Sequence, residues 1–121
     1  QFISIEDGQI VAAYIMDHDC DAAYHTVHWL IDAKDDEMVV LHGLRVLPEY
    51  GGRGYSKQLV QHAIDTARAR KLKSIRLDCI EGNDVPQKMY MSFGFTYIDT
   101  VEITYVDIGT PREFLLYELV L

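Results

Sequence analysis

The spacing of apolar and polar residues divides the chain into short strands and two helices. Apolar runs at 2–5 and 10–16 lie on either side of Glu6-Asp7-Gly8-Gln9, and this arrangement predicts a β-hairpin. The run EMVVLHGLRVLP, residues 37–48, predicts a long strand that stops at its proline, because proline has no N–H to donate to a sheet. Three more strands are predicted, at 74–80, 96–105 and 114–121.

Helical spacing is clearest over residues 55–71. Its apolar positions fall on one stripe of a helix, and cations gather in the last turn, where the helix dipole favours positive charge. The stripe consists of Leu59, Val60, Ala63, Ile64 and Ala67.

A second, shorter helix is predicted over NDVPQKMYMSFGF, residues 83–95. Asn83 or Asp84 would cap its start, Pro86 is tolerated in its first turn, and Gly94 would end it. Residues 17–37 show neither the alternation of a strand nor the spacing of a helix. They hold seven carboxylates against one lysine, and their structure is left open. The order strand, strand, strand, helix, strand, helix, strand, strand indicates an α+β or mixed α/β sheet.

Length, composition and charge narrow the class of protein. The 121 residues are expected to form a single domain, 1–121, and an apolar content of 49% is typical of a folded chain. The net charge of −8 argues against nucleic-acid binding, because phosphate contacts need a basic surface. Two cysteines are too few for a disulfide framework and favour a reduced, cytoplasmic setting.

The ends of the chain and its apolar runs give two further expectations. No run reaches the roughly 20 apolar residues that a membrane span needs, and there is no signal peptide, so no membrane partner is expected. The chain begins at Gln1 rather than methionine, which is consistent with a fragment or with a preceding segment.

A glycine-rich turn joins the long strand to the first helix. Gly51, Gly52 and Gly54 leave backbone N–H groups bare, and a helix N-terminus carries a positive partial charge. No Asp or Glu occurs between residues 51 and 64, and six of the eleven Lys and Arg residues lie between 51 and 73. This local reversal of charge favours a bound phosphate; the alternative is a flexible turn with solvated cations.

Two common phosphate-binding loops do not match this turn. A Rossmann fingerprint would need glycine at the position of Lys57, and a P-loop would need Gly-Lys-Ser or Gly-Lys-Thr at its end. Another kind of phosphate ligand is therefore expected.

The stretch LRVLPEYGGRGYSKQL, followed by NDVPQKMYMSFGF, resembles the GNAT superfamily of acyl-CoA-dependent N-acetyltransferases. The first motif of that family, L-x-V-x-P followed by Q/R-x-x-G-x-G/A, is matched at Leu44, Val46, Pro48 and Gly54. Gly51 stands where Gln or Arg is usual, and Ser56 where Gly or Ala is usual. The second motif is matched at Asn83, Tyr90, Gly94 and Phe95, with Pro86 in an alanine position.

The resemblance implies a mixed, mostly antiparallel sheet with flanking helices and two central parallel strands that splay apart. The pantetheine arm of acetyl-CoA would lie between these strands, near Leu44 to Val46 and Arg76 to Cys79. The usual first strand and first two helices are expected to be missing. Cofactor contacts are expected from Leu44, Arg45, Val46, Gly51, Gly52, Arg53, Gly54, Tyr55, Ser56, Lys57, Asn83 and Tyr90.

Catalysis would require a proton donor for the departing thiolate and a base for the amine. The resemblance places Tyr90 beside the cofactor sulfur as the acid; the alternative is a core tyrosine. His42 lies two residues before Leu44, on the same strand face, and is the predicted base. Asp78 and Glu81 are the rival bases, and His42 has the alternative of a purely structural strand histidine.

Other reactive side chains carry weaker expectations. Cys79 has no evident histidine partner and is expected to be a buried thiol rather than a nucleophile. Tyr24, Trp29 and the acids of 17–37 could line an entrance for a cationic amine, or form a solvated acidic loop. The histidines show no metal-ligand pattern, so no metal is expected.

The sequence therefore predicts an N-acetyltransferase that uses acetyl-CoA and a small-molecule or protein amine by direct attack. The alternative is a non-catalytic CoA-binding or regulatory module of the same fold. A homodimer is left open.

Overall fold

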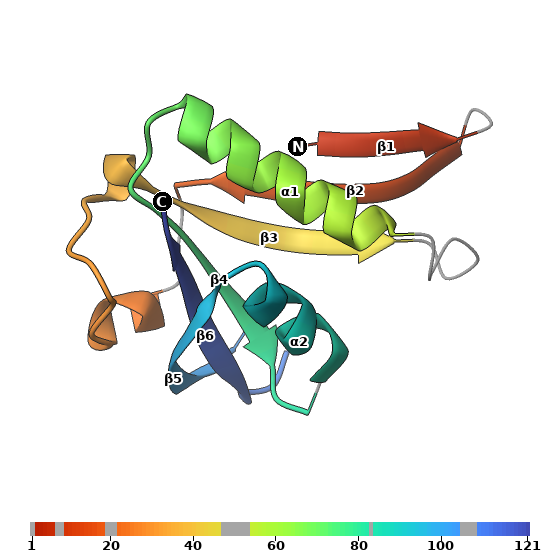
Figure 1. Ribbon diagram of the computed structural model, residues 1–121. Helices are drawn as coiled ribbons and strands as arrows, with labels where there is room; N and C mark the ends of the chain where they lie inside the picture. Colours follow the sequence, from red (N-terminus) through yellow and green to blue (C-terminus); the bar gives the residue numbers. More distant parts are fainter. Residues whose placement is uncertain (1, 7–8, 19–21, 47–53, 83, 105–108) are drawn as a thin grey trace.

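A computed structural model shows six strands in one mixed sheet, with two helices packed against it (Figure 1). It describes residues 2–6, 9–18, 22–46, 54–82, 84–104 and 109–121. The strands are β1 (Phe2–Glu6), β2 (Gln9–Asp17), β3 (Met38–Val46), β4 (Ser74–Ile80), β5 (Thr96–Ile103) and β6 (Arg112–Val120). The helices are α1 (Tyr55–Ala69) and α2 (Asp84–Ser92), with short 3-10 helices η1 (Ala22–Thr26) and η2 (Asp35–Glu37).

The strand order is β1-β2-β3-β4-β6-β5, and every neighbouring pair is antiparallel except β3 and β4. The predicted hairpin is confirmed as β1 and β2, and the later predicted strands and both helices are found within a few residues of their expected bounds. The expected mixed α+β fold with central parallel strands is therefore confirmed.

The two central strands separate soon after they meet. Parallel pairing joins Met38 to Ser74, Val39 to Ile75 and Val40 to Arg76. Beyond this point β3 continues beside β2 as far as Val46, while β4 continues beside β6 as far as Ile80. Among the described residues, the inner edges of β3 and β4 have no further strand partner, and the sheet is split between them. This is the predicted splay.

Both helices pack on one face of the sheet, which we call the helix face (Figure 1). The predicted apolar stripe of α1 is buried there, against alternating residues of the central strands such as Val39, Ile75 and Leu77. The α1 helix ends at Ala69, and Lys71 follows in the left-handed conformation with φ of 58°. Its N–H donates to the Arg68 carbonyl, and the next N–H donates to the Ala67 carbonyl, which closes the last turn.

The end of α2 explains the spacing of the motif Tyr-x-x-x-Gly-Phe. Gly94 has a φ of 98°, as predicted for the residue that ends this helix, and donates to the Met91 carbonyl. Phe95 donates from its backbone to the Tyr90 carbonyl, and the two rings pack edge to face with centroids 5.6 Å apart. The helix end therefore fixes the position of the Tyr90 ring.

The opposite face, which we call the open face, is partly covered by residues 22–37. This segment, whose structure the sequence left open, consists of η1, η2 and an irregular connection. Tyr24 is buried there with Met38, Val40 and Leu116. None of the described helices is long and apolar enough to span a membrane.

Candidate active site

The start of α1 carries backbone N–H groups that no described side chain caps. Gly54 is its N-cap residue in the left-handed conformation, no side chain caps this end, and the first turn holds no acid. The first N–H groups of a helix have no acceptor within the helix, so the first turn keeps a positive partial charge. The predicted Gly51, Gly52 and Arg53 lie outside the described residues, as does Asn83. Gly54, Tyr55, Ser56 and Lys57 form the described part of the predicted phosphate cradle.

The predicted contacts on β3 lie beyond the point where the sheet splits. Arg45 pairs with Ala13 and Val46 pairs with Ala12, so β2 occupies one side of this strand end. The other side, toward β4, carries backbone groups without a described strand partner. A ligand with amide groups can bind such an edge as an added strand would.

Tyr90 lies on the helix face beside the other side of the split. It is 6% exposed and close to Cys79 of β4. Burial raises the pKa of Tyr90 well above its usual value, and the charges of Cys79 and Asp78 act in the same direction. The phenol therefore stays protonated across the working pH range, as an acid or hydrogen-bond donor must.

Cys79 does not have the properties of a nucleophile. It is buried, and burial raises the pKa of its thiol from 9.0 to about 12, with a smaller contribution from the Asp78 charge. The reactive thiolate is therefore scarce near neutral pH.

His42 and Asp78 both lie on the open face, one on each side of the split. His42 Nε2 lies 2.9 Å from Asp17 Oδ1, and both side chains are about one-third to two-fifths exposed. The Tyr24 hydroxyl donates a 2.6 Å hydrogen bond to Asp78 Oδ2. Each candidate base therefore has a polar partner that orients it.

The predicted acid and the predicted bases are thus on opposite faces of the sheet. The split between β3 and β4 lies between them. Glu81 follows β4 and is exposed, and its hydrogen bond to Glu113 raises the pKa of Glu113. Of the three candidate bases, His42 and Asp78 lie on the strands that flank the split.

A buried ion pair fixes residues 22–37 on the open face, and sequence reasoning did not identify it. Arg76 Nε donates to Glu118 Oε2 at 2.7 Å, and the two side chains are only 7% and 0% exposed. Glu118 also accepts 2.7 Å bonds from the Leu30 N–H and the Ser74 hydroxyl. The signal for such a pair was an opposite charge in each of two largely apolar strands, Arg76 in SIRLDCI and Glu118 in FLLYELVL.

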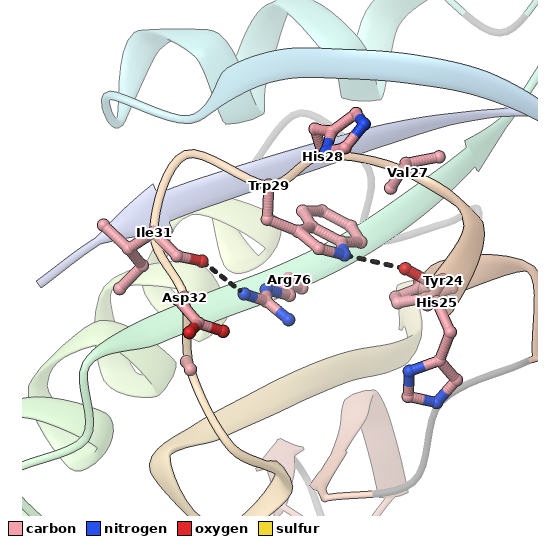
Figure 2. Close-up of a pocket in the computed structure, with 9 residues that line it drawn as sticks. Tyr24, His25, Val27, His28, Trp29, Ile31, Asp32 and Arg76 are labelled. Carbon is pink, nitrogen blue, oxygen red and sulfur yellow. Dashed lines mark hydrogen bonds between the residues drawn. The ribbon is translucent and has the colours of Figure 1, made fainter.

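The same network encloses a pocket of about 360 Å³ (Figure 2). Arg76 also donates from Nη2 to the Ile31 carbonyl at 3.0 Å, and its guanidinium lies 4.5 Å from the centroid of the Trp29 ring. The Trp29 indole donates to the Tyr24 carbonyl at 2.8 Å. The pocket is lined by Tyr24, His25, Val27, His28, Trp29, Ile31, Asp32, Ala33 and Arg76.

Comparison with known proteins identifies the family. The sequence profile of the Acetyltransferase (GNAT) family matches residues 2–95. The [ribosomal protein bS18]-alanine N-acetyltransferase of Haemophilus ducreyi is 34% identical over 58 residues, which make up 48% of this chain and 40% of that protein.

Solved structures share the fold at low sequence identity. The ribosomal-protein-alanine N-acetyltransferase of Brucella melitensis superimposes with a TM-score of 0.74 at 18% identity, over 98% of this chain and 67% of that one. An acetyltransferase of Salmonella typhimurium, solved with its cofactor acetyl-CoA, gives a TM-score of 0.72 at 18% identity. The match covers 98% of this chain and 62% of that one. The chain thus spans about two-thirds of the length of these structures.

Proposed function

The chain belongs to the GNAT acetyltransferase family, and we propose from this that it transfers an acetyl group from acetyl-CoA to a primary amine by direct attack in a ternary complex. The observation that supports this reaction best is the split sheet, with an uncapped helix N-terminus near it and Tyr90 beside it. A metal is not part of the proposal.

The described residues fit the two polar parts of coenzyme A. A diphosphate suits the first turn of α1, where Ser56 and Lys57 follow Gly54 and no acid competes. The amides of a pantetheine arm suit the open backbone edge of β3 at residues 44–46. When bound, acetyl-CoA supplies a thioester carbonyl, which β3 backbone N–H groups would polarise as its oxygen gains charge. The remaining predicted contacts, at Gly51, Gly52, Arg53 and Asn83, belong to the same proposal.

Each bond change in the transfer is matched by a proton transfer. The amine nitrogen bonds to the acetyl carbon, the carbon–sulfur bond breaks, and the sulfur leaves as a thiolate. Tyr90 hydrogen-bonds to this sulfur and hands it a proton, which the phenolate then regains from solvent as the thiol leaves. Because its phenol is a weaker acid than a thiol, hydrogen bonding to the thiolate is the larger part of its contribution.

The proton lost by the amine goes to a group on the open face. His42 is the proposed base, because an imidazole can accept a proton from the amine and Asp17 holds this imidazole beside the split. Asp78 is the second candidate, because it lies directly across the split and Tyr24 fixes its carboxylate. The acceptor is a small-molecule or protein amine; the relatives named above that acetylate a ribosomal-protein alanine are examples of the second kind. A cytoplasmic location is proposed with this activity.

The test is thiol release from acetyl-CoA with a panel of primary amines, using wild type and Tyr90→Phe. We expect amine-dependent release in wild type and a loss of roughly 10²-fold in turnover for the variant, with CoA affinity by calorimetry within about twofold. Tyr97→Phe, an exposed tyrosine on β5, is the matched control and should leave both quantities unchanged. CoA binding without release for any amine would instead support a non-catalytic CoA-binding module.

A further inference from the structure

Tyr24 connects residues 22–37 to the split in the sheet. Its ring is 2% exposed and packs in the core of the open face. Its hydroxyl donates a 2.6 Å hydrogen bond to Asp78 Oδ2. Asp78 lies two positions beyond Arg76, the last β4 residue that pairs with β3. Tyr24 therefore joins the segment that covers the open face to a carboxylate at the edge of the split.

The position of the Tyr24 ring is fixed by a chain of further contacts. The Trp29 indole donates to the Tyr24 carbonyl at 2.8 Å, and the two ring centroids are 5.4 Å apart (Figure 2). The Arg76 guanidinium lies 4.5 Å from the centroid of the Trp29 ring and is held in turn by the buried Glu118. A buried ring with these contacts has little freedom to move, so the hydrogen bond orients the Asp78 carboxylate rather than the phenol.

The orientation of Asp78 matters because its charge acts at the split. Besides burial, this charge contributes to the raised pKa of Cys79 and to that of Tyr90 on the helix face. A carboxylate has two oxygens with about four acceptor sites, so it can accept another donor beside the Tyr24 hydroxyl. An ammonium ion is the donor that matches its charge best.

His42 lies at the equivalent position of β3. Val40 pairs with Arg76, and His42 and Asp78 are each two residues further on, on the open face. Paired strands are about 4.8 Å apart, and beyond this last pair β3 and β4 follow different neighbours. A nitrogen bound to the Asp78 carboxylate would therefore lie at the level of the proposed base.

We propose that Tyr24 is a positioning residue, which holds the Asp78 carboxylate at the split so that it binds the acceptor as an ammonium ion. Alkylamines are protonated near neutral pH, as lysine is. One proton leaves the bound nitrogen, to His42 or to Asp78 itself, before the nitrogen attacks the thioester, and a second leaves as the amide forms. The departing thiolate gains one proton, so each turnover releases one proton to solvent. The inference rests on the proposed acetyl transfer and adds Tyr24 to the acceptor site.

Two amines of similar size test whether Tyr24 acts through charge. Slightly above neutral pH, ethylamine is an ammonium ion, whereas trifluoroethylamine is neutral because fluorine withdraws electrons. Tyr24→Phe keeps the ring and removes the hydroxyl. We expect its KM for ethylamine to rise about tenfold, as the loss of one hydrogen bond to a charged group allows. Its kcat, and its KM for trifluoroethylamine, should stay within about twofold of wild type. Tyr97→Phe, an exposed tyrosine on β5, is the matched control.

A double variant tests whether the effect passes through Asp78. Asp78→Asn alone should raise the KM for ethylamine at least tenfold, because it removes the charge that binds the ammonium ion. Adding Tyr24→Phe to Asp78→Asn should then change this KM by less than about twofold. Losses that simply add would show that Tyr24 acts by packing and not through the carboxylate.

The hydrogen bond can also be followed without turnover. The proton of a short, buried hydroxyl-to-carboxylate bond gives a downfield NMR resonance, which is assigned by its contacts with the Tyr24 ring protons. In wild type with excess CoA, ethylammonium chloride should move this resonance upfield, because the ammonium ion shares the carboxylate charge. Sodium chloride at the same concentration is the control and should not move it.

A Tyr24 resonance that ethylammonium does not move would overturn the inference, even if Tyr24→Phe does not fold. Equal losses for ethylamine and trifluoroethylamine in a folded Tyr24→Phe would overturn it as well. If ethylamine is acetylated and its KM does not depend on Tyr24, the acetyl transfer stands and the positioning role is wrong. If ethylammonium moves the Tyr24 resonance but no amine releases CoA, the ammonium site stands and the transfer reaction is wrong.

Discussion

Replacing Glu118 with alanine tests how much of the structure depends on the buried ion pair. Glu118 is fully buried and accepts three 2.7 Å hydrogen bonds, from Leu30, Ser74 and Arg76. Its removal leaves the Arg76 guanidinium without a counter-charge in a site that is 7% exposed. An uncompensated buried charge costs about 3–5 kcal/mol, so we expect the free energy of unfolding to fall by that amount. For a domain of this size the melting temperature should drop by about 12–20 °C.

The measurement is urea unfolding followed by circular dichroism and by Trp29 fluorescence. Glu102→Ala, an exposed glutamate on β5, is the matched control and should change the free energy of unfolding by less than about 0.5 kcal/mol. The double variant Arg76→Met with Glu118→Leu should recover most of the lost stability, because it removes both charges and fills their volume.

A loss below about 1 kcal/mol for Glu118→Ala would refute this reasoning. So would a double variant as unstable as the single one, because the cost would then arise from lost packing rather than from the unpaired charge. Trp29 fluorescence adds a local measure: we expect residues 22–37 to loosen in Glu118→Ala, with a red-shifted emission in the folded protein.

The site gives four further predictions. The general base matters most at low pH, where the amine is protonated. The variant that removes the base, either His42→Ala or Asp78→Asn, should therefore lose about 10²-fold in kcat/KM at low pH and less at high pH. A pH profile parallel to that of wild type rejects the substituted residue as the base. Gly54 has a φ of 81°, so Gly54→Ala should strain the backbone by about 1–2 kcal/mol and weaken CoA binding measured by calorimetry. Gly109→Ala, at a φ of 76°, is the control and should not change CoA binding. Equal CoA affinities of wild type and Gly54→Ala would show that the α1 N-terminus is not part of the phosphate cradle. In a Cys20→Ser background, Cys79 should be alkylated at pH 8 roughly 10³-fold more slowly in the folded protein than in urea, and fast labelling would contradict its burial. The unfolded chain loses this thiol proton above pH 9.0 and the folded protein only near pH 12, so the free energy of unfolding should fall between these values, a slope that Cys79→Ala removes.

The elements of this fold were predictable because each one carries its own local signal. The apolar stripe of α1, the two apolar runs of the first hairpin and the glycine that ends α2 act over a few residues, and the structure places α1, β1, β2 and Gly94 as expected. The parallel pairing and the split came from the family resemblance, since no local pattern states which strands are neighbours.

The structure of residues 22–37 could not be predicted for the opposite reason. Its anchors are distant in sequence: Leu30 bonds to Glu118, 88 residues away, and Tyr24 bonds to Asp78, 54 residues away. A segment without periodicity gives no sign of such partners. His42 lies on the open face because it follows Leu41, which is buried on the helix face, whereas Tyr90 is placed by helix α2. The choice between His42 and Asp78 depends on proton affinities that neither spacing nor position determines.

The early parting of β3 and β4 has a consequence for the free protein. A sheet normally protects its interior backbone by pairing, but among the described residues the inner edges of β3 and β4 have no strand partner beyond Val40 and Arg76. The cosubstrate would therefore complete the sheet as well as supply the acyl group. Amide hydrogen exchange of residues 41–46 and 77–80 should slow markedly with CoA, while β1 and β5 at the outer edges should keep their rates.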